Sequence, residues 1–328
     1  MNSILVLLNN EKVKERQFKS CFGVSKANFA KILNYFAPIW EQKRETEKAI
    51  RWEGKERKYH EGSGKKLKLP TAESALAFVF YYFKEYPKFD VLGAQFNMSG
   101  SSANKLFHYH RQTLLEALAQ MNVLPKTSFE DVHQFQEFIR NNGIEQILID
   151  AFERQVERSQ DKDQQKLHFS GKKKRHTVKN TIISNAQRAI LFLSLTAPGT
   201  VHDLEQLRQH FKPGMNWFEA LQVLVDLGYL GLDKTYPNSD MLIPKRRKPR
   251  RGKNLLLSEE ELFPQTDKDH NRMVSQLRIW VEHAIRGIKR FNCLINVWRN
   301  RLPDFQDAAV LTAAGLWNLH LGVHFHIS

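Results

Sequence analysis

Two aspartates in the second half of the chain, Asp150 and Asp226, follow apolar runs that are typical of buried strands. Asp150 ends the run that starts at Ile144, and Asp226 ends the sequence LQVLVD at 221–226. Carboxylate oxygens are ligands that Mg²⁺ prefers, and Mn²⁺ takes the same type of ligand. Two hard cations about 3.5–4 Å apart can activate the attacking oxygen and stabilise the leaving oxygen when a phosphodiester is cleaved. The two aspartates therefore indicate metal-dependent phosphoryl transfer, provided that they converge with further acids.

A third acid, Glu282, lies on the polar side of a helix predicted over residues 271–293. The apolar positions of this helix share the opposite side: Leu277, Val281, Ala284, Ile288 and Phe291. Three cations accompany Glu282 at spacings of four and seven residues: Arg278, Arg286 and Lys289. An exposed helix face with salt bridges would show the same pattern. We expect Glu282 to join Asp150 and Asp226 because all three acids lie next to the predicted sheet.

Asp203 is the alternative to Asp226 as the second acid of this group. We favour Asp226, because Thr200 and Asp203 have the spacing of a capping box at a helix start. A carboxylate at the end of a buried strand has no such structural explanation. The remaining acids nearby are interpreted as solvated loop residues: Asp161, Asp163 and Asp233.

The charge of the chain indicates a polyanionic partner. Fifty Lys and Arg against 35 Asp and Glu give a net charge of +15, which favours nucleic acid, although a generic basic surface would give the same balance. One basic cluster precedes or lies on the second predicted strand: Lys172, Lys173, Lys174, Arg175 and Lys179. A second, PKRRKPRRGKN at 244–254, is predicted to be a loop over the site. We expect both to contact the DNA backbone, the alternative being solvated loops or a localisation signal.

The first part of the chain is predicted to be helical. Ser25 begins a helix within 24–40, residues 41–68 lack apolar periodicity and are expected to be a connection, and Pro70-Thr71 begins another helix. A short helix over 90–98, a turn at Ser99-Gly100 and a helix capped by Ser101 or Ser102 follow. This arrangement near 74–119 is typical of a DNA-reading helix-turn-helix, and also of helical bundles that bind nothing. The base-reading candidates on the second helix are Ser101, Asn104 and Lys105.

The second part is predicted to be an α/β domain. A helix over 130–142 ends at Asn142-Gly143, and strands follow at 144–149, 176–185 and 189–198. A helix over 203–211 and the strand at 221–226 complete the pattern. We therefore expect a helical DNA-binding domain over 1–142 and a catalytic domain over 143–328 with a basic insertion near 233–270.

Nothing in the sequence indicates a signal peptide or a transmembrane helix. Cys21 and Cys293 lack the spacing of a zinc site and do not indicate a disulfide framework. We expect a cytoplasmic, nucleoid-associated bacterial protein without a small-molecule cofactor.

Four stretches in this order resemble DDE transposases of the insertion-sequence family five and Harbinger-type group: ILIDAFERQVERSQDK, HFSGKKKRHTVKN, VLVDLGYLGL and RIWVEHAIRGIKRF. The last reproduces an R-x3-E-x6-K arrangement as Arg278, Glu282 and Lys289. The resemblance covers roughly residues 144–300 and implies an RNase H-like catalytic domain with the triad Asp150, Asp226 and Glu282.

The resemblance further implies two Mg²⁺ or Mn²⁺ ions, with Asp150 between both, and phosphate contacts from Arg278 and Lys289. The implied partner is double-stranded DNA at the element's terminal inverted repeats, bound by a homodimer that pairs two ends. Two alternatives stay open: a transposase-derived DNA-binding regulator without catalysis, and an RNase H-like nuclease that cleaves without strand transfer.

Overall fold

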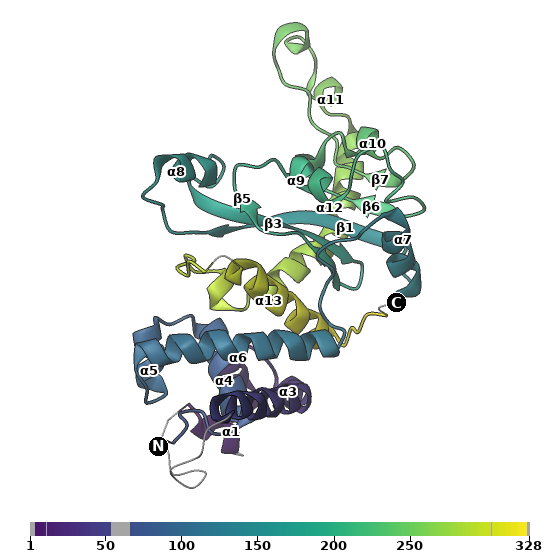
Figure 1. The fold of residues 1–328 in the computed structure, drawn as a ribbon. Helices are drawn as coiled ribbons and strands as arrows, with labels where there is room; N and C mark the ends of the chain where they lie inside the picture. The colour runs from purple at the N-terminus through teal and green to yellow at the C-terminus, as the bar shows by residue number, and fades with distance from the viewer. Residues whose placement is uncertain (1–3, 11, 54–65, 303, 327–328) are drawn as a thin grey trace. The chain divides into compact units, whose positions relative to one another are not determined.

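The computed structural model of the protein describes residues 4–10, 12–53, 66–302 and 304–326 (Figure 1). Its packing separates two compact units that do not follow the order of the chain. The helical unit consists of Met1–Leu124, Lys289–Asn296 and Ala308–His324, and the sheet unit consists of Pro125–Ile288, Val297–Asp307 and Phe325–Ser328. These packing units are not the same as the domains expected from the sequence, 1–142 and 143–328. That division into domains stays a prediction.

The described part of the helical unit is built from helices, of which α3 with 27 residues and α6 with 21 residues are the longest. Its elements are α1 (Val6–Asn9), α2 (Glu15–Phe22), α3 (Lys26–Trp52), α4 (Ala72–Glu85), α5 (Phe89–Gln95), α6 (Gly100–Gln120), η3 (Asn292–Leu294) and most of α13 (Phe305–Leu321). Fully buried phenylalanines fill its core: Phe22, Phe36, Phe78, Phe80, Phe83, Phe96 and Phe107. The apolar run in α4 is buried as its sequence predicts, because α2, α3 and α6 all pack against it.

Helix α3 confirms Ser25 as a cap, since its hydroxyl accepts a hydrogen bond from the Asn28 amide. The helix runs further than predicted, to Trp52, so the prediction of a connection over 41–52 is wrong. Glu, Lys and Arg are good helix formers, and Lys43 forms a salt bridge of 2.7 Å that links this part of α3 to Glu116 of α6. Residues 54–65 of the predicted connection lie outside the described residues.

A tight turn joins α5 to α6. Ser99 caps α6 by accepting a hydrogen bond from the Ser102 amide at 3.2 Å, so the predicted cap at Ser101 or Ser102 is wrong by two or three residues. Gly100 is the first residue of the helix, and a Cβ there would stand 2.0 Å from a carboxylate oxygen of Asp90. The turn therefore needs a glycine for the close approach of α5, and the local pattern of serines does not reveal this.

The sheet unit contains a seven-stranded mixed sheet with the order β2-β3-β1-β6-β7, in which β4 and β5 also pair with β3. The strands are β1 (Gln146–Gln155), β2 (Phe169–Ser170), β3 (Arg175–Asn185), β4 (Ile190–Leu193), β5 (Ala197–Pro198), β6 (Gln222–Leu224) and β7 (Asp240–Leu242). Strands β1 and β3 are antiparallel, whereas β1, β6 and β7 run parallel. The chain is thus a helical N-terminal region followed by an α/β domain, as predicted.

The described helices of the sheet unit are α7 (Val132–Asn141), α8 (Lys162–His168), α9 (Asp203–His210), η1 (Leu227–Tyr229), α10 (Leu232–Thr235), η2 (Gly252–Asn254), α11 (Glu259–Leu262) and α12 (Gln265–Ile288). Leu148 of β1, Leu224 of β6 and Val281 of α12 form one buried cluster. This cluster fixes α12 beside the point where β1 and β6 are neighbours.

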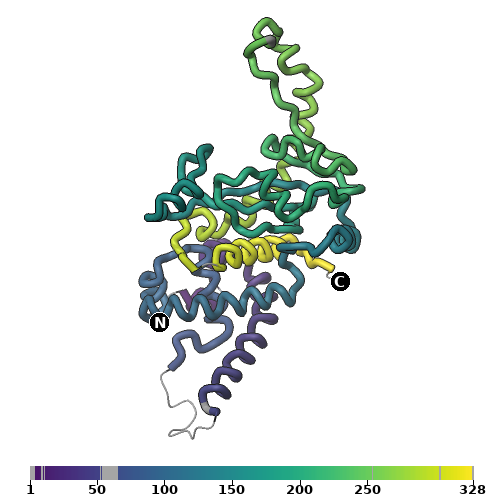
Figure 2. The backbone as a smooth tube through the Cα atoms, turned by 45° about the horizontal axis from the view of Figure 1, so that its top comes forward, coloured from purple at the N-terminus to yellow at the C-terminus, as the bar shows by residue number. Residues whose placement is uncertain are grey.

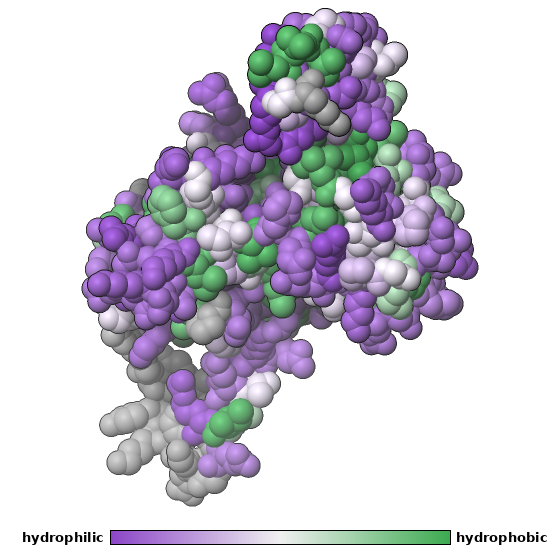
Figure 3. All heavy atoms as spheres, turned by 90° about the horizontal axis from the view of Figure 1, so that it is seen from above, coloured by the Kyte–Doolittle hydropathy of each residue, from purple (hydrophilic) through white to green (hydrophobic). Residues whose placement is uncertain are grey.

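The basic segment near 244–262 leaves the body of the sheet unit as a finger that carries α11 (Figures 1 and 2). Its end carries exposed leucines: Leu255 is 61% and Leu256 is 95% exposed. Seen from above, hydrophobic side chains gather at the end of the finger and again on the surface beside it, among hydrophilic ones (Figure 3). Within the described residues, no helix has the length and apolar content to cross a membrane.

Candidate functional site

Asp150 lies inside strand β1, which continues to Gln155, so the prediction that it ends a strand is wrong. The residues after Asp150 stay in the strand because they pair with β3, in the register Asp150 to Ile182. The Asp150 side chain is only 16% exposed. Its Oδ1 accepts from the Ala151 amide at 2.8 Å, and its Oδ2 accepts from Nη2 of Arg278 at 3.2 Å.

The pKa of Asp150 is raised to about 6, first by burial of the carboxyl group. Arg278 opposes this increase, the carboxylates of Asp226 and Asp203 add to it, and the hydrogen bond from Ala151 opposes it. Three aspartates therefore interact electrostatically at one place in the sheet unit.

Asp226 follows strand β6 and caps the short helix η1. Its Oδ1 accepts from the Gly228 amide at 2.7 Å, and its Oδ2 lies 4.0 Å from Nη2 of Arg278. The same guanidinium thus faces Asp150 and Asp226, which are far apart in the sequence. A cavity of about 240 Å³ lies beside them and is lined by Asp226, Leu227, Pro244, Asn271, Ser275 and Arg278.

Gly228 has a steric role in the stretch VLVDLGYLGL, two residues after Asp226. A Cβ at this position would stand 2.9 Å from Oδ1 of Asp226 and 2.8 Å from Oδ2 of Asp203. Both contacts are too short for a carbon atom, so a side chain here would push the two carboxylates away. The glycine therefore lets the two acids approach one side of η1.

Asp203 does not form the predicted capping box, so that explanation is wrong. Helix α9 begins at Asp203, the residue before it makes no side-chain cap, and the Thr200 hydroxyl donates to the Leu167 carbonyl instead. Oδ1 of Asp203 accepts from Nζ of Lys179 at 2.7 Å. The sequence could not separate this role from an ordinary acid in the first turn of a helix.

Lys179 was expected to face DNA, but its side chain is only 6% exposed and pairs with Asp203. We therefore group it with the acids. Tyr229, fully buried under the same cluster, has a pKa raised well above its usual value by burial and by Asp150, Asp203 and Asp226.

Glu282 lies on α12, four residues after Arg278, and is exposed. The described part of the chain contains no group of three or more His, Cys, Asp or Glu side chains arranged to hold a metal ion. The structure thus brings Asp150 and Asp226 to one guanidinium, whereas Glu282 is not grouped with them. Its membership of the triad stays a prediction.

The other predicted site residues are spread over both units. Lys172, Lys173, Lys174 and Arg175 are exposed at the turn into β3, where Arg175 also donates to Gln155. In the helical unit, Ser101, Asn104 and Lys105 occupy the first turns of α6, and Ser101 and Lys105 are exposed. Lys289 follows the end of α12. Asp161, expected to be a solvated loop acid, instead caps α8 by accepting from two backbone amides.

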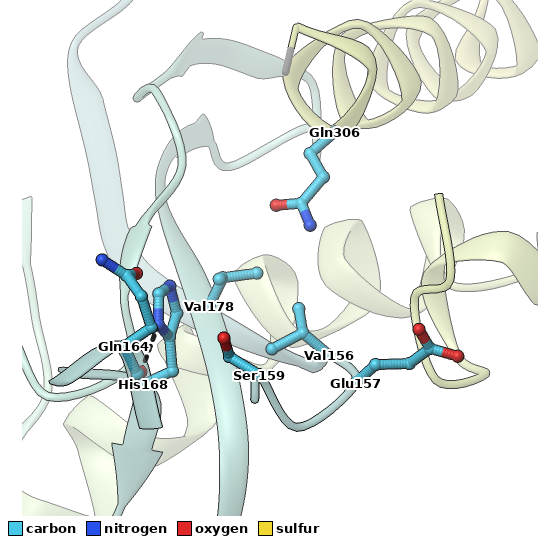
Figure 4. Close-up of a pocket in the computed structure, with 7 residues that line it drawn as sticks. All are labelled: Val156, Glu157, Ser159, Gln164, His168, Val178 and Gln306. Atoms are coloured by element: carbon cyan, nitrogen blue, oxygen red, sulfur yellow. Dashed lines mark hydrogen bonds between the residues drawn. The ribbon is translucent and has the colours of Figure 1, made fainter. Parts of the chain in front are cut away.

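A second hollow of about 200 Å³ has a different character (Figure 4). It lies where β1 ends and α8 packs near β3, and His168 contacts the Gln164 carbonyl there at 2.8 Å. Glu157 is the one acid among its lining residues. It therefore lacks the paired carboxylates that distinguish the first site.

A mixed sheet that places two partly buried aspartates beside a helical arginine is the kind of acidic site expected of an α/β nuclease. Comparison with known proteins agrees: residues 149–318 match the family described as DDE superfamily endonuclease, and the chain belongs to this family. The chain is also 27% identical over 317 residues to a protein of Microchaete diplosiphon named "Probable transposase for insertion sequence element IS702". The match covers 95% of this chain and 98% of that protein. No solved structure matches the chain significantly. The resemblance to DDE transposases is therefore confirmed.

Proposed function

We propose that this protein is a DNA transposase that cleaves phosphodiesters at the ends of its element and joins the freed 3′-hydroxyl to target DNA. The observation that carries the proposal is the meeting of Asp150 and Asp226 at one guanidinium inside the region that matches the endonuclease family. Similarity to a probable transposase over almost the whole chain supports it.

The residues of the site fit divalent cations. Asp150 and Asp226 supply oxygen donors, their charges repel each other, and Arg278 already offers them positive charge between β1 and η1. We propose that Asp150 and Asp226 hold the two Mg²⁺ or Mn²⁺ ions, with Glu282 as the third member, on the strength of the R-x3-E-x6-K arrangement. When bound, such ions supply Lewis-acid charge to the reacting oxygens.

The chain's own groups then have separate tasks. Asp150 is held by the sheet and by the Ala151 amide, and Asp226 is held by the turn at Gly228, so both carboxylates are oriented before substrate arrives. A phosphate oxygen carries negative charge, as the two carboxylates do. Arg278 can therefore release the carboxylates and bind a phosphate oxygen instead.

DNA would be bound by several surfaces of the protein. We propose that α5 and α6 act as a helix-turn-helix, with Ser101, Asn104 and Lys105 at the base edges. In the sheet unit, which we propose to be RNase H-like, the basic turn at 172–175 and the finger near 244–262 would grip the backbone. A homodimer would pair two element ends.

The proposal is tested with a duplex that carries the element's terminal repeat, in the presence of Mg²⁺. We expect Asp226→Asn and Glu282→Gln to lose cleavage while they still bind the duplex. The exposed Asp233 of α10 provides the matched control, and Asp233→Asn should cleave normally. Cleavage at the wild-type rate in the Asp226 variant would refute the proposal. Pre-cut ends with a free 3′-hydroxyl separate a transposase from a simple nuclease, because only a transposase joins them to a second duplex.

One observation favours a second candidate, a DNA-binding regulator derived from a transposase. Glu282 is exposed and is not grouped with the two aspartates. If the wild-type protein binds terminal repeats specifically and cleaves none under any divalent cation, the regulator is the better description.

A further inference from the structure

The finger of the sheet unit, residues 244–262, carries hydrophobic side chains at its end (Figure 3). Leu256 is 95% and Leu255 is 61% exposed, whereas Leu262 at the end of α11 is 1% exposed. The segment thus buries one leucine and leaves two adjacent leucines in solvent. Apolar surface in water is unfavourable, so two exposed leucines at a protruding end suit contact with another molecule.

The turn that presents these leucines is fixed by its backbone rather than by burial. Gly252 begins η2 with a φ of +58°, a conformation that favours glycine. The Leu255 amide donates to the Gly252 carbonyl at 3.1 Å, and the Asn254 side chain donates to the Pro249 carbonyl at 3.2 Å. Truncation of the exposed Leu256 side chain should therefore leave the turn intact.

The two arms of the finger are held to each other. Glu259 of α11 accepts from Arg247 at 2.5 Å and from Arg250 at 2.7 Å. The Lys248 amide donates to the Leu262 carbonyl at 3.0 Å. Contacts between the arms restrict the finger before any partner binds, so less order has to be gained on binding.

The finger is anchored beside the acidic site. The Asn271 side chain on α12 accepts from the Lys245 amide at 2.7 Å and donates to the Lys245 carbonyl at 2.9 Å. Asn271 lies two helical turns, about 10 Å, before Arg278 on the same helix. The cavity of about 240 Å³ at Asp226 is also lined by Pro244 at the start of the finger. A substrate at the acidic site would thus pass the root of the finger.

The charge of the finger favours a polyanion over a neutral partner. Six of its Lys and Arg side chains are exposed, against three exposed glutamates. Proteins that bend DNA combine cations on the phosphate backbone with an apolar side chain that enters between two base pairs. The exposed cations of the arms are Lys245, Arg246, Arg247, Lys248, Arg250 and Arg251.

We infer that the end of the finger is an apolar wedge that enters the base stack of double-stranded DNA, with Leu256 at its tip and Leu255 beside it. This inference rests on the proposed function, because it takes DNA as the molecule at the acidic site. It adds a role that contact with the backbone alone does not imply. A base step opened by Leu256 bends more easily, which would help to bring the adjacent phosphodiester to the carboxylates.

The experiment measures base unstacking directly in the full chain. A duplex with the element's terminal repeat carries 2-aminopurine in turn at each position around the cleaved bond, and Ca²⁺ replaces Mg²⁺ as the hard cation. The fluorescence of 2-aminopurine rises when the base leaves the stack. With saturating protein, we expect an increase at one or two positions for wild type and loss of this increase for Leu256→Ala, while fluorescence anisotropy shows that the variant still binds.

Two variants serve as controls. Leu256→Phe keeps an apolar wedge and should keep the increase. Leu195→Ala truncates another exposed leucine of the sheet unit, 57% exposed, and should behave as wild type does. In Mg²⁺, Leu256→Ala should cleave the paired duplex about 10-fold or more slowly, because unstacking a base step is costly. A mismatch at the responding position should restore its rate, since a mismatched base is already poorly stacked.

Equal fluorescence increases in wild type and Leu256→Ala, or no increase with wild type bound, would overturn the inference. If the increase is absent and Leu256→Ala instead abolishes self-association or binding to anionic vesicles, the leucines dock on a second copy or on lipid, and the wedge is wrong. Cleavage without a Leu256-dependent increase refutes the wedge alone. A Leu256-dependent increase without cleavage under Mg²⁺ or Mn²⁺ supports the wedge and refutes the proposed catalysis.

Discussion

Replacement of Asp150 by asparagine should stabilise the protein at neutral pH when no divalent cation is present. The pKa of Asp150 is raised to about 6 from an ordinary value of 3.8. The folded protein therefore takes up this proton more readily than the unfolded chain does. The ionised carboxylate opposes folding: its cost is absent well below pH 4, grows between about pH 4 and pH 6, and is complete above pH 6.

The size of this effect follows from the pKa difference. About two pKa units at about 1.4 kcal/mol each give a cost of about 3 kcal/mol above pH 6. Asparagine keeps an oxygen that can accept from the Ala151 amide, and it removes the repulsion from Asp226 and Asp203. The asparagine variant also loses the attraction to Arg278. That attraction already lowers the pKa of Asp150, so the value of about 6 includes it.

The assay is urea unfolding of wild type and Asp150→Asn in EDTA at pH 4 and at pH 7.5. We expect nearly equal free energies of unfolding at pH 4 and a more stable variant at pH 7.5, by about 1–3 kcal/mol. Asp233→Asn, which removes an exposed carboxylate from α10, is the control for the loss of one acid. A difference between wild type and Asp150→Asn that does not grow with pH would refute the electrostatic reasoning about this cluster.

Three further outcomes are expected. Gly228→Ala should destabilise the sheet unit by about 1–3 kcal/mol through contacts below 3 Å, whereas Gly171→Ala, with no atom within 4 Å of its Cβ, should unfold at nearly the wild-type urea concentration. Ser99→Ala should cost about 1 kcal/mol in a thermal or urea melt because it removes the cap of α6, and equal losses from Ser101→Ala would contradict this assignment. In a DNA-binding titration, Lys172→Ala/Lys173→Ala should reduce the slope of log affinity against log salt concentration by up to about 2. An unchanged slope would show that this turn does not contact the DNA backbone.

Local patterns in the sequence predicted most elements of the sheet unit. The apolar run before Asp150, the helix around Glu282 and the strand before Asp226 all exist, because burial imposes their periodicity directly on the chain. Their ends were less predictable. Strand β1 continues past Asp150 because β3 pairs with it, and that pairing is a property of two segments at once.

The chemistry of the site was predictable in residue type and less so in geometry. The apolar run at 221–226 pointed to Asp226, and the structure adds a reason for the glycine at 228, which is the approach of a carboxylate from α9. The sequence did not predict the pairing of Asp203 with Lys179, because each residue also fits an ordinary local role, as a cap and as a surface lysine. Their ion pair joins β3 to α9, and no local pattern encodes it.

Arg278 connects the observed geometry of the acidic site with its proposed chemistry. It contacts Asp150 at 3.2 Å and lies 4.0 Å from Asp226, and its side chain is 19% exposed. Like charges in a poorly solvated site repel strongly, so the two carboxylates need positive charge nearby to remain close together. The helix that carries Arg278 also carries Glu282 one turn later, about 6 Å along the axis. A cation held by the same carboxylates would compete with the guanidinium, and a guanidinium released from them would be free to bind a phosphate on the same helix face. One helix would then couple occupation of the acidic site to the grip on DNA.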